Sequence, residues 1–154
     1  MDRHELIAYY RTGHDDVVEA LVGIDEEQLD RRPAPSEWTS REIVHHLADG
    51  ETRSYLRLRE ILTGSPAVVQ AYAENEWVVA LPTYRLPIGP SLVVLHAVRA
   101  ATEQLIDAMT DADWAKETVH SEAGRFSADT WLEWYARHPH DHADQIRRAR
   151  RGEV

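Results

Sequence analysis

The segment Trp38-Thr39-Ser40-Arg41-Glu42-Ile43-Val44-His45-His46-Leu47-Ala48-Asp49-Gly50-Glu51 decides the fold of this chain. It opens with the pattern of a capping box, in which the Thr39 hydroxyl accepts a hydrogen bond from the backbone N–H of Glu42 and the Glu42 carboxylate accepts one from the backbone N–H of Thr39. Apolar and small residues then recur every three or four positions until Gly64 and Pro66 end the pattern. The segment therefore predicts a long helix with one buried face.

Three further segments show the same helical period. In each of them apolar residues recur at intervals of three and four positions, as expected of a helix that buries one face. No strand pattern competes with these segments. The sequence therefore predicts an all-α fold, a four-helix bundle, in a single domain that spans residues 1–154. Beside the helix that starts at Thr39, we predict helices from Asp2 to Val22, from about Ser91 to Met109, and from Ser127 or Ala128 to about Arg150.

Two of the connections between the predicted helices contain prolines. The first, residues 23–37, contains Pro33 and Pro35. The second, residues 67–90, carries three prolines after a segment from Ala71 to Val79 that we predict as a short helix. A connection of this length often has a function, such as that of a lid beside a binding site.

Composition excludes several classes of protein. The chain has no cysteine, which excludes disulfides, thiolate metal ligands, iron–sulfur clusters and a cysteine nucleophile. Its net charge of −10 disfavours nucleic-acid binding, and the arginines within residues 147–151 are typical of a helix C-terminus. No apolar run approaches the ~20 residues of a membrane span, and the charged N-terminus carries no apolar signal segment. We expect a cytoplasmic protein that binds neither nucleic acid nor membranes, with Trp131 and Trp134 packed inside the bundle.

Two histidines in the last predicted helix are candidate metal ligands. His138 and His142 are four residues apart, which places both imidazoles on one helix face, one turn apart. Pro139 lies between them and should kink the helix, because it lacks an N–H and its ring clashes with the carbonyl of the preceding turn. Two ligands hold a metal ion weakly, so a metal site needs a third ligand from elsewhere in the chain.

His46 is the best candidate for this third ligand. It lies on the apolar face of the capped helix, near the start, where that helix can cross the last one. His14 and His96 can also point inward. Single inward histidines are most often hydrogen-bonded core residues, so a structural role remains the alternative for all of them. The remaining histidines fall on faces or in loops where we expect contact with solvent: His4, His45, His120 and His140.

Several polar residues lie close to the three candidate ligands in sequence. For the carboxylates we favour contact with solvent over a role beside the site, and for Glu42 the capping role. Gln145 follows His142 by three positions and can reach either the site or a neighbouring helix. The carboxylates concerned are Glu42, Asp49, Glu51 and Asp141.

Two stretches of the chain resemble a known family. Residues 38–51 are similar to the helix-two signature of the DinB/YfiT-like superfamily of metalloenzymes: a tryptophan, a small hydroxyl residue, Glu-Ile or Glu-Leu, and a ligand histidine followed by an apolar residue. His46 takes the ligand place. Residues 138–146 resemble the C-terminal signature, with His138 and His142 in the ligand places and Gln-Ile after them. Arg99 and the turn at residues 124–127 are similar too, so the resemblance spans nearly the whole chain.

The resemblance implies an up-down-down-up bundle, often a homodimer, with a three-histidine site for Zn²⁺ or Ni²⁺. It also implies activities that include thiol-dependent transferases and isomerases using mycothiol or bacillithiol. Three imidazoles leave a coordination position open, where a metal ion can activate water for hydrolysis or a low-molecular-weight thiol for transfer. We therefore expect a metal-dependent hydrolase or thiol S-transferase that acts on a small molecule. The alternatives are a non-catalytic metal-binding stress-response bundle with a structural metal, and a helical protein without metal.

Overall fold

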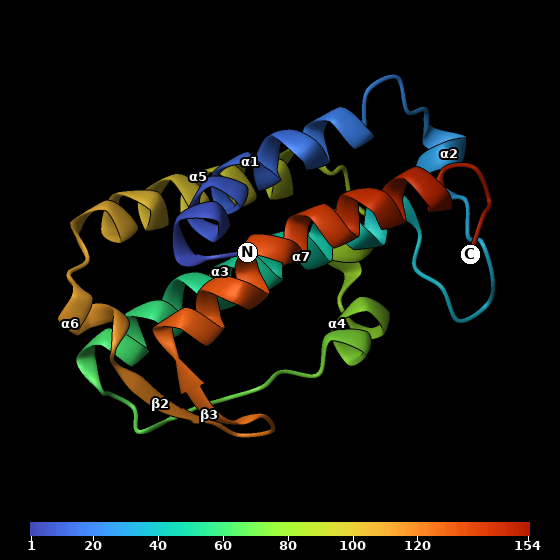
Figure 1. Cartoon of the computed structure of the whole chain (residues 1–154). Helices are drawn as coiled ribbons and strands as arrows, with labels where there is room; N and C mark the ends of the chain where they lie inside the picture. The colour runs from blue at the N-terminus through green and yellow to red at the C-terminus, as the bar shows by residue number, and fades with distance from the viewer.

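Four long helices make up most of the structure, a computed structural model that describes residues 1–154 (Figure 1). They are α1 (Arg3–Ala20), α3 (Ser40–Thr63), α5 (Gly89–Ala108) and α7 (Ala128–Ala149). α1 and α7 run in one direction, and α3 and α5 run in the opposite direction. The prediction of an all-α, up-down-down-up four-helix bundle is confirmed, and each long helix begins and ends within two residues of its predicted bounds.

Short elements fill the connections. α2 (Glu26–Asp30) lies between α1 and α3, and α6 (Asp111–Trp114) follows α5. The long connection from α3 to α5 contains α4 (Glu74–Ala80) and the 3₁₀ helix η1 (Pro82–Arg85), so the predicted short helix exists but starts three residues later than expected. This connection passes over one side of the bundle, where α4 lies below α7 in Figure 1.

A small sheet covers one end of the bundle, although the sequence analysis predicts no strand. β1 (Val68–Val69) pairs in parallel with β2 (Glu117–His120), which pairs antiparallel with β3 (Gly124–Ser127). The prediction was wrong because strands of two to four residues are too short to show the alternation that marks a half-buried strand. The hairpin of β2 and β3 places His120 beside α3 and the start of α7.

The capping box that opens α3 has the predicted geometry. The Glu42 backbone N–H donates to the Thr39 hydroxyl at 3.2 Å, and the Thr39 backbone N–H donates to the Glu42 carboxylate at 2.9 Å. A cap of this kind stabilises a helix by about 1 kcal/mol. It fixes where α3 begins, and this start determines that His46 lies on the buried face of the helix.

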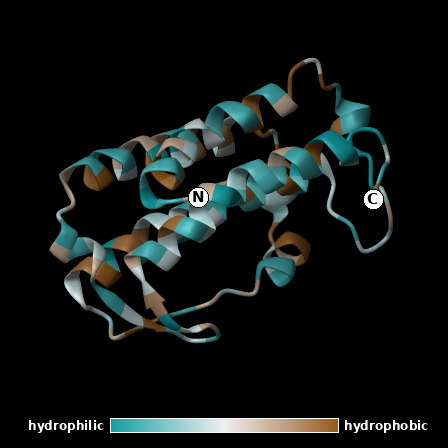
Figure 2. Ribbon diagram, viewed as in Figure 1, coloured by the Kyte–Doolittle hydropathy of each residue, from teal (hydrophilic) through white to brown (hydrophobic).

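The apolar core is divided into two clusters with a polar layer between them. One cluster lies towards the sheet and includes Tyr10, Leu58 and Trp131. The other lies towards α2 and includes Val17, Leu47 and Ile146. Between these positions on each helix lie the buried polar residues of the bundle centre. Hydrophilic residues cover much of the visible face of α7 towards its C-terminus (Figure 2). No helix combines the length and the apolar character that crossing a membrane requires.

Arg99 and Glu51 form an ion pair inside this polar layer. Both side chains are almost fully buried, and the Arg99 Nη1 donates to the Glu51 Oε1 at 2.9 Å. The same guanidinium donates to the backbone carbonyls of Tyr10 in α1 and Tyr135 in α7, and it lies over the Tyr10 ring. A buried charge is tolerated where its donors find acceptors, and here the acceptors come from three other helices.

The Tyr135 carbonyl accepts a hydrogen bond from the Arg99 side chain because Pro139 cannot supply the usual backbone donor. In a helix this carbonyl would accept from the backbone N–H of residue 139, which proline lacks. Arg99 supplies the missing donor at 3.3 Å, and α7 continues without interruption from Ala128 to Ala149. The proline ring packs against Gly13 of α1.

We predict that Gly13→Ala destabilises the protein. A Cβ at this position would lie 2.3 Å from the Pro139 Cγ and 3.0 Å from the Arg99 Nη2, so α1 would have to move away from α7. The free energy of unfolding should fall by about 1–3 kcal/mol, although alanine alone favours a helix over glycine by about 1 kcal/mol. Urea denaturation measures the change. Gly89→Ala is the matched control, because no neighbouring atom lies within 4 Å of its added Cβ. Equal midpoints for the two variants would contradict the prediction.

Candidate metal centre

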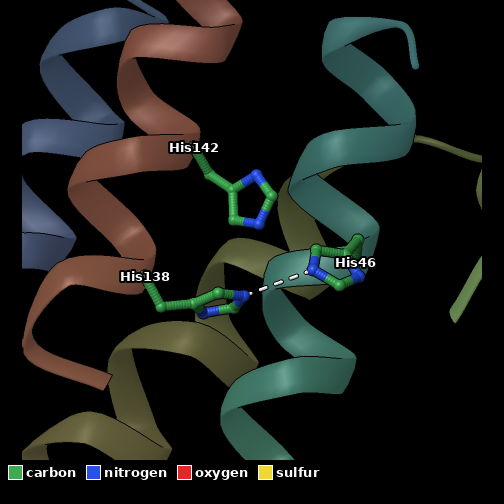
Figure 3. Close-up of side chains that lie close together, drawn as sticks. All are labelled: His46, His138 and His142. Carbon is green, nitrogen blue, oxygen red and sulfur yellow. Dashed lines mark hydrogen bonds between the residues drawn. The ribbon is translucent and has the colours of Figure 1, made fainter. Parts of the chain in front are cut away.

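Three imidazoles meet in the polar layer of the bundle. His46 comes from α3, and His138 and His142 come from successive turns of α7 (Figure 3). The His46 Nε2 lies 3.2 Å from the His138 Nε2, and one nitrogen from each of the three rings lies within 4.8 Å of the others. The structure therefore brings together all three residues that the sequence analysis selected as metal ligands.

Burial keeps two of these imidazoles neutral. It lowers the pKa of His46 to about 2 and that of His142 to about 3, and in both cases the neighbouring histidines add to the effect. A neutral imidazole has a free lone pair on one ring nitrogen, which is the form that binds a metal ion. At neutral pH the cluster therefore offers nitrogen lone pairs rather than positive charges.

Fixed partners orient the two imidazoles from α7. The His138 Nδ1 lies 3.4 Å from the Glu51 Oε1, and the His142 Nδ1 lies 2.8 Å from the Gln145 Oε1. Both partner oxygens are acceptors, so each Nδ1 carries the proton and each Nε2 is left with a lone pair. Metal-binding histidines in proteins are commonly held this way, by a carboxylate or carbonyl oxygen behind the ring.

The connection between α3 and α5 supplies two further contacts to His46. The Tyr72 hydroxyl lies 3.3 Å from the His46 Nδ1, and the Glu74 Oε2 lies 3.9 Å from the His46 Nε2. Trp38 covers the cluster from another side, with its ring centroid 4.7 Å from that of His46 and 6.3 Å from that of His142. Sequence reasoning missed Tyr72 and Glu74 as individual residues. The length of the connection was the only signal, and it indicated a segment beside the site.

A divalent metal ion fits this donor set. The three side chains are uncharged nitrogen donors, they come from rigid helices, and each has a partner that fixes its ring. Three histidines with no further protein ligand are the pattern of catalytic rather than structural zinc sites. His46, His138 and His142 are the residues that would hold the ion.

Gly50 leaves the space that His138 occupies. A Cβ on this glycine would lie 2.9 Å from the His138 Cε1 and 3.5 Å from the Tyr72 hydroxyl. Glycine inside a helix costs about 1 kcal/mol relative to alanine. The position of Gly50 one turn after His46 is therefore explained by the close approach of α7.

Three histidines that we expected to contact solvent are buried instead. His45 bonds to the Ser91 hydroxyl and the Leu86 carbonyl, and His140 stacks on Tyr9. His120 is enclosed by aromatic rings of the β2–β3 hairpin and α7. The prediction was wrong because it counted only apolar side chains as buried, whereas a histidine with hydrogen-bond partners is also stable inside. His4 is exposed, as expected.

His14 and His96 form a pair away from the cluster. Their ring centroids are 4.7 Å apart across α1 and α5, and His96 is exposed. Neither belongs to the group of residues that could hold a metal ion. The inward orientation that the sequence analysis allowed for His96 was therefore wrong.

The carboxylates near the ligands differ in their surroundings. Glu51 is only 1 % exposed, so the preference for solvent contact was wrong for this residue. Its partner Arg99 is more than 45 residues away in sequence, which explains why a local pattern could not identify the pair. Asp141 is exposed as expected, and Asp49 accepts a hydrogen bond from the Tyr84 hydroxyl at 2.7 Å. Glu42 has the predicted capping role.

Two cavities adjoin the cluster. The larger, of about 580 Å³, is lined by Tyr72 and Glu74 on the side of His46. A smaller one, of about 170 Å³, is lined by Trp38, His142 and Gln145. The smaller cavity reaches His142 itself, whereas the larger one reaches only the residues that contact His46, so the cluster is open towards the surface on the side of His142.

Comparison with known proteins identifies the family. Residues 9–146 match the model of the DinB superfamily. The chain belongs to the DinB superfamily. It is 34 % identical over 144 residues to a protein of Geobacillus kaustophilus named "Putative metal-dependent hydrolase", with 92 % of this chain and 80 % of that protein covered. A protein of the same description from Bacillus mycoides is 30 % identical over 131 residues, with 85 % and 75 % covered.

Solved structures with the DinB fold are similar over nearly the whole chain. YfiT from Bacillus subtilis, described as a probable metal-dependent hydrolase with an unusual four-helix bundle topology, has a TM-score of 0.86 at 23 % identity, with 95 % of this chain and 86 % of that chain covered. A mycothiol-dependent maleylpyruvate isomerase has a TM-score of 0.74 at 17 % identity, with 95 % and 61 % covered. At these identities the likeness concerns the fold alone.

We predict that each of the three clustered histidines is needed for metal binding. His46→Ala, His138→Ala and His142→Ala should each lower the metal content of the purified protein to a small fraction of one ion per chain after exposure to Zn²⁺ or Ni²⁺, because two imidazoles hold an ion weakly. Elemental analysis measures this. His45→Ala and His140→Ala are the controls and should retain the ion, with circular dichroism to confirm the fold. Full occupancy in His46→Ala would show that the third ligand was chosen incorrectly.

We also predict that the metal-free protein loses stability in mild acid. An unfolded histidine takes up a proton near pH 6.5, whereas burial keeps folded His46 and His142 neutral down to about pH 2 and about pH 3. The unfolded state therefore binds more protons below about pH 6.5, and the free energy of unfolding falls as the pH drops from there towards 3. Urea denaturation between pH 7 and 5 should show a shallower decline in His142→Gln than in the control His4→Gln. Parallel declines would count against neutral, buried imidazoles.

Proposed function

We propose that this DinB-family chain is a divalent-metal-dependent enzyme that acts on a small molecule. Zn²⁺ or Ni²⁺ is held by His46, His138 and His142. The convergence of three neutral imidazoles carries the proposal, because three protein ligands leave a coordination position free for a reactant. The smaller cavity supports it, since His142 lines it, and the larger cavity lies beside the cluster across Tyr72 and Glu74.

The bound ion supplies Lewis acidity at its open position, where it lowers the pKa of a water molecule or a thiol. The chain supplies the orientation of the ligands. Glu51 and Gln145 hold the rings of His138 and His142 from behind, and Tyr72 contacts His46. Trp38 shields the cluster from bulk water on one side. Donors that are held rigidly and are partly buried strengthen electrostatic interactions with a reacting group.

Glu74 is the residue to which we assign proton transfer. Its Oε2 lies 3.9 Å from the His46 Nε2, and it lines the larger cavity. The side chain is 49 % exposed, so it can exchange protons with solvent. A carboxylate in this place can accept the proton of a nucleophile held at the centre and return it to the leaving group.

Two reactions are compatible with this centre. Hydrolysis is supported by the names of the relatives that are at least 30 % identical to the chain. Thiol S-transfer is supported by the mycothiol-dependent isomerase, which shares the fold. In the first the nucleophile is water and in the second it is a low-molecular-weight thiol, and the same three histidines serve both. A homodimer, expected from the family resemblance, is part of the proposal.

The experiment compares metal-loaded and metal-free protein in two assays. One follows hydrolysis of a panel of ester, amide and lactone substrates, and the other follows conjugation of a model electrophile by several low-molecular-weight thiols. We predict a rate that depends on Zn²⁺ or Ni²⁺ in at least one assay. Glu74→Gln should lower that rate by roughly 10²–10⁴-fold with unchanged metal content, whereas Glu19→Gln on the outer face of α1 should not lower it.

Absence of a metal-dependent rate in every assay, with one ion bound per chain, would contradict the enzymatic proposal. It would favour the alternative of a metal that braces α3 against α7 in a non-catalytic stress-response bundle. In that case removal of the ion should lower the free energy of unfolding. Size-exclusion chromatography with light scattering tests the homodimer separately.

A further inference from the structure

The larger cavity contains a buried cation that no carboxylate of the chain neutralises. Arg57 from α3 lines the cavity and is only 6 % exposed. Its Nη1 donates to the Tyr135 hydroxyl at 2.5 Å and its Nη2 donates to the Gln70 carbonyl at 2.6 Å, but it takes part in no ion pair. Arg99, the other strongly buried arginine of the bundle centre, is paired with Glu51. Buried charges are normally paired, so Arg57 is an exception that needs a counter-ion.

The Arg57 guanidinium also has a donor without an acceptor. Its Nε is buried and has no hydrogen-bond partner, which is also true of the Arg99 Nε, but Arg99 has a carboxylate to neutralise its charge. An unsatisfied buried donor costs about 1–3 kcal/mol, and more when the group is charged. The two neutral acceptors that Arg57 does have do not remove its charge. An oxygen acceptor with a negative charge would satisfy both requirements at once.

His120 also lines this cavity and has a second unpartnered donor. Its side chain is 5 % exposed, and its Nδ1 accepts from the backbone N–H groups of Glu122 and Ala123, each at 3.3 Å. Nδ1 therefore carries no proton, and in the neutral ring the proton is on Nε2. The Nε2 is buried and has no partner. Burial and the charge of Arg57 lower the pKa of His120, which agrees with a neutral ring whose Nε2–H is a donor.

One wall of the cavity is formed by Trp134, and carboxylates lie at its rim. Trp134 is 41 % exposed, so the prediction that it packs inside the bundle was wrong. Its ring lies against those of His120 and Phe126, with centroids 5.7 Å and 4.9 Å away. Glu74, Glu76 and Glu122 are exposed carboxylates of the lining, and none of them pairs with Arg57. An acidic rim repels ligands with several negative charges, whereas a single carboxylate can be accommodated at the basic inner end.

We infer that the inner end of this cavity is a binding site for a carboxylate group, which Arg57 and His120 hold through the Arg57 Nε–H and the His120 Nε2–H. The ligand class is a small monocarboxylate with an apolar or aromatic body that lies along Trp134. Arginine suits a carboxylate because its guanidinium presents several N–H donors in one plane.

Tyr72 and Tyr135 connect this carboxylate site to the histidine cluster. Tyr72 lines the cavity and contacts His46, while Tyr135 accepts from Arg57 and its ring lies edge-on to His138, with centroids 6.0 Å apart. A ligand anchored at Arg57 therefore lies beside two residues that also contact the histidine cluster. Naming this ligand as the substrate rests on the proposed function, but carboxylate binding itself needs no metal.

The test uses the full-length, metal-free protein and the probe benzoate, with benzamide as its uncharged counterpart. Isothermal titration calorimetry measures the affinities. We expect benzoate to bind and benzamide to bind at least about tenfold more weakly, because hydrogen bonds to a charged group contribute about 1.5–3 kcal/mol. Phenyl phosphate should bind more weakly than benzoate because of the acidic rim. Tighter binding of phenyl phosphate would overturn the assignment to carboxylates.

Variants locate the binding site. Arg57→Gln should weaken benzoate binding about tenfold to hundredfold, and Arg137→Gln, on the exposed face of α7, is the control for the change in net charge. His120→Phe removes the second donor and should weaken binding several-fold. Thermal unfolding gives a second readout: benzoate should raise the midpoint of the wild-type protein and of Arg137→Gln but not that of Arg57→Gln.

Equal affinity for benzoate in Arg57→Gln and Arg137→Gln, or no binding of benzoate to the wild-type protein, would overturn the inference. Both results are independent of metal content and of catalysis. Metal uptake tests the proposed function, and benzoate binding tests this inference. A protein that binds benzoate but takes up no metal would contradict the proposed function and support this inference.

Discussion

The ion pair between Arg99 and Glu51 is the interaction on which the rest of the structure depends. It joins all four long helices, because Arg99 of α5 bonds to Glu51 of α3 and to the carbonyls of Tyr10 in α1 and Tyr135 in α7. Glu51 in turn contacts the His138 ring. Removal of one partner of a buried pair typically costs about 3–5 kcal/mol, since the other charge is left without compensation. The pair therefore holds the bundle together and aligns one candidate ligand.

Local patterns in the sequence were sufficient to predict the four long helices and the three candidate metal ligands. The capping box at Thr39 fixes the helical phase of α3, and that phase turns His46 rather than His45 towards α7. The four-residue spacing of His138 and His142 places both rings on one face. The features that could not be predicted depend on contacts between distant segments. The short strand β1 exists only because it pairs with β2, which lies about 50 residues later in the chain. Glu51 is buried because Arg99, in another helix, pairs with it.

Polar groups in the interior fall into two kinds. The candidate ligands have partners, since the rings of His138 and His142 are held by Glu51 and Gln145, although the Arg99 Nε in the same layer has none. The groups at the inner end of the large cavity lack partners, because the Arg57 Nε and the His120 Nε2 have no acceptor. Satisfied groups make a rigid frame, while unsatisfied ones lower stability unless a ligand completes them. The histidine rings are therefore fixed in place, whereas the donors of Arg57 and His120 remain free to bind a ligand.

The continuation of α7 through Pro139 has a consequence for how a metal ion would be retained. The turn that carries His138 lacks one of its own backbone hydrogen bonds, and the donor that replaces it belongs to α5. The geometry of α7 next to His138 is thus completed only when α5 is docked. Release of an ion and undocking of α5 should then be thermodynamically linked. The ion's dissociation rate would report on motions of a helix that contributes no ligand to it.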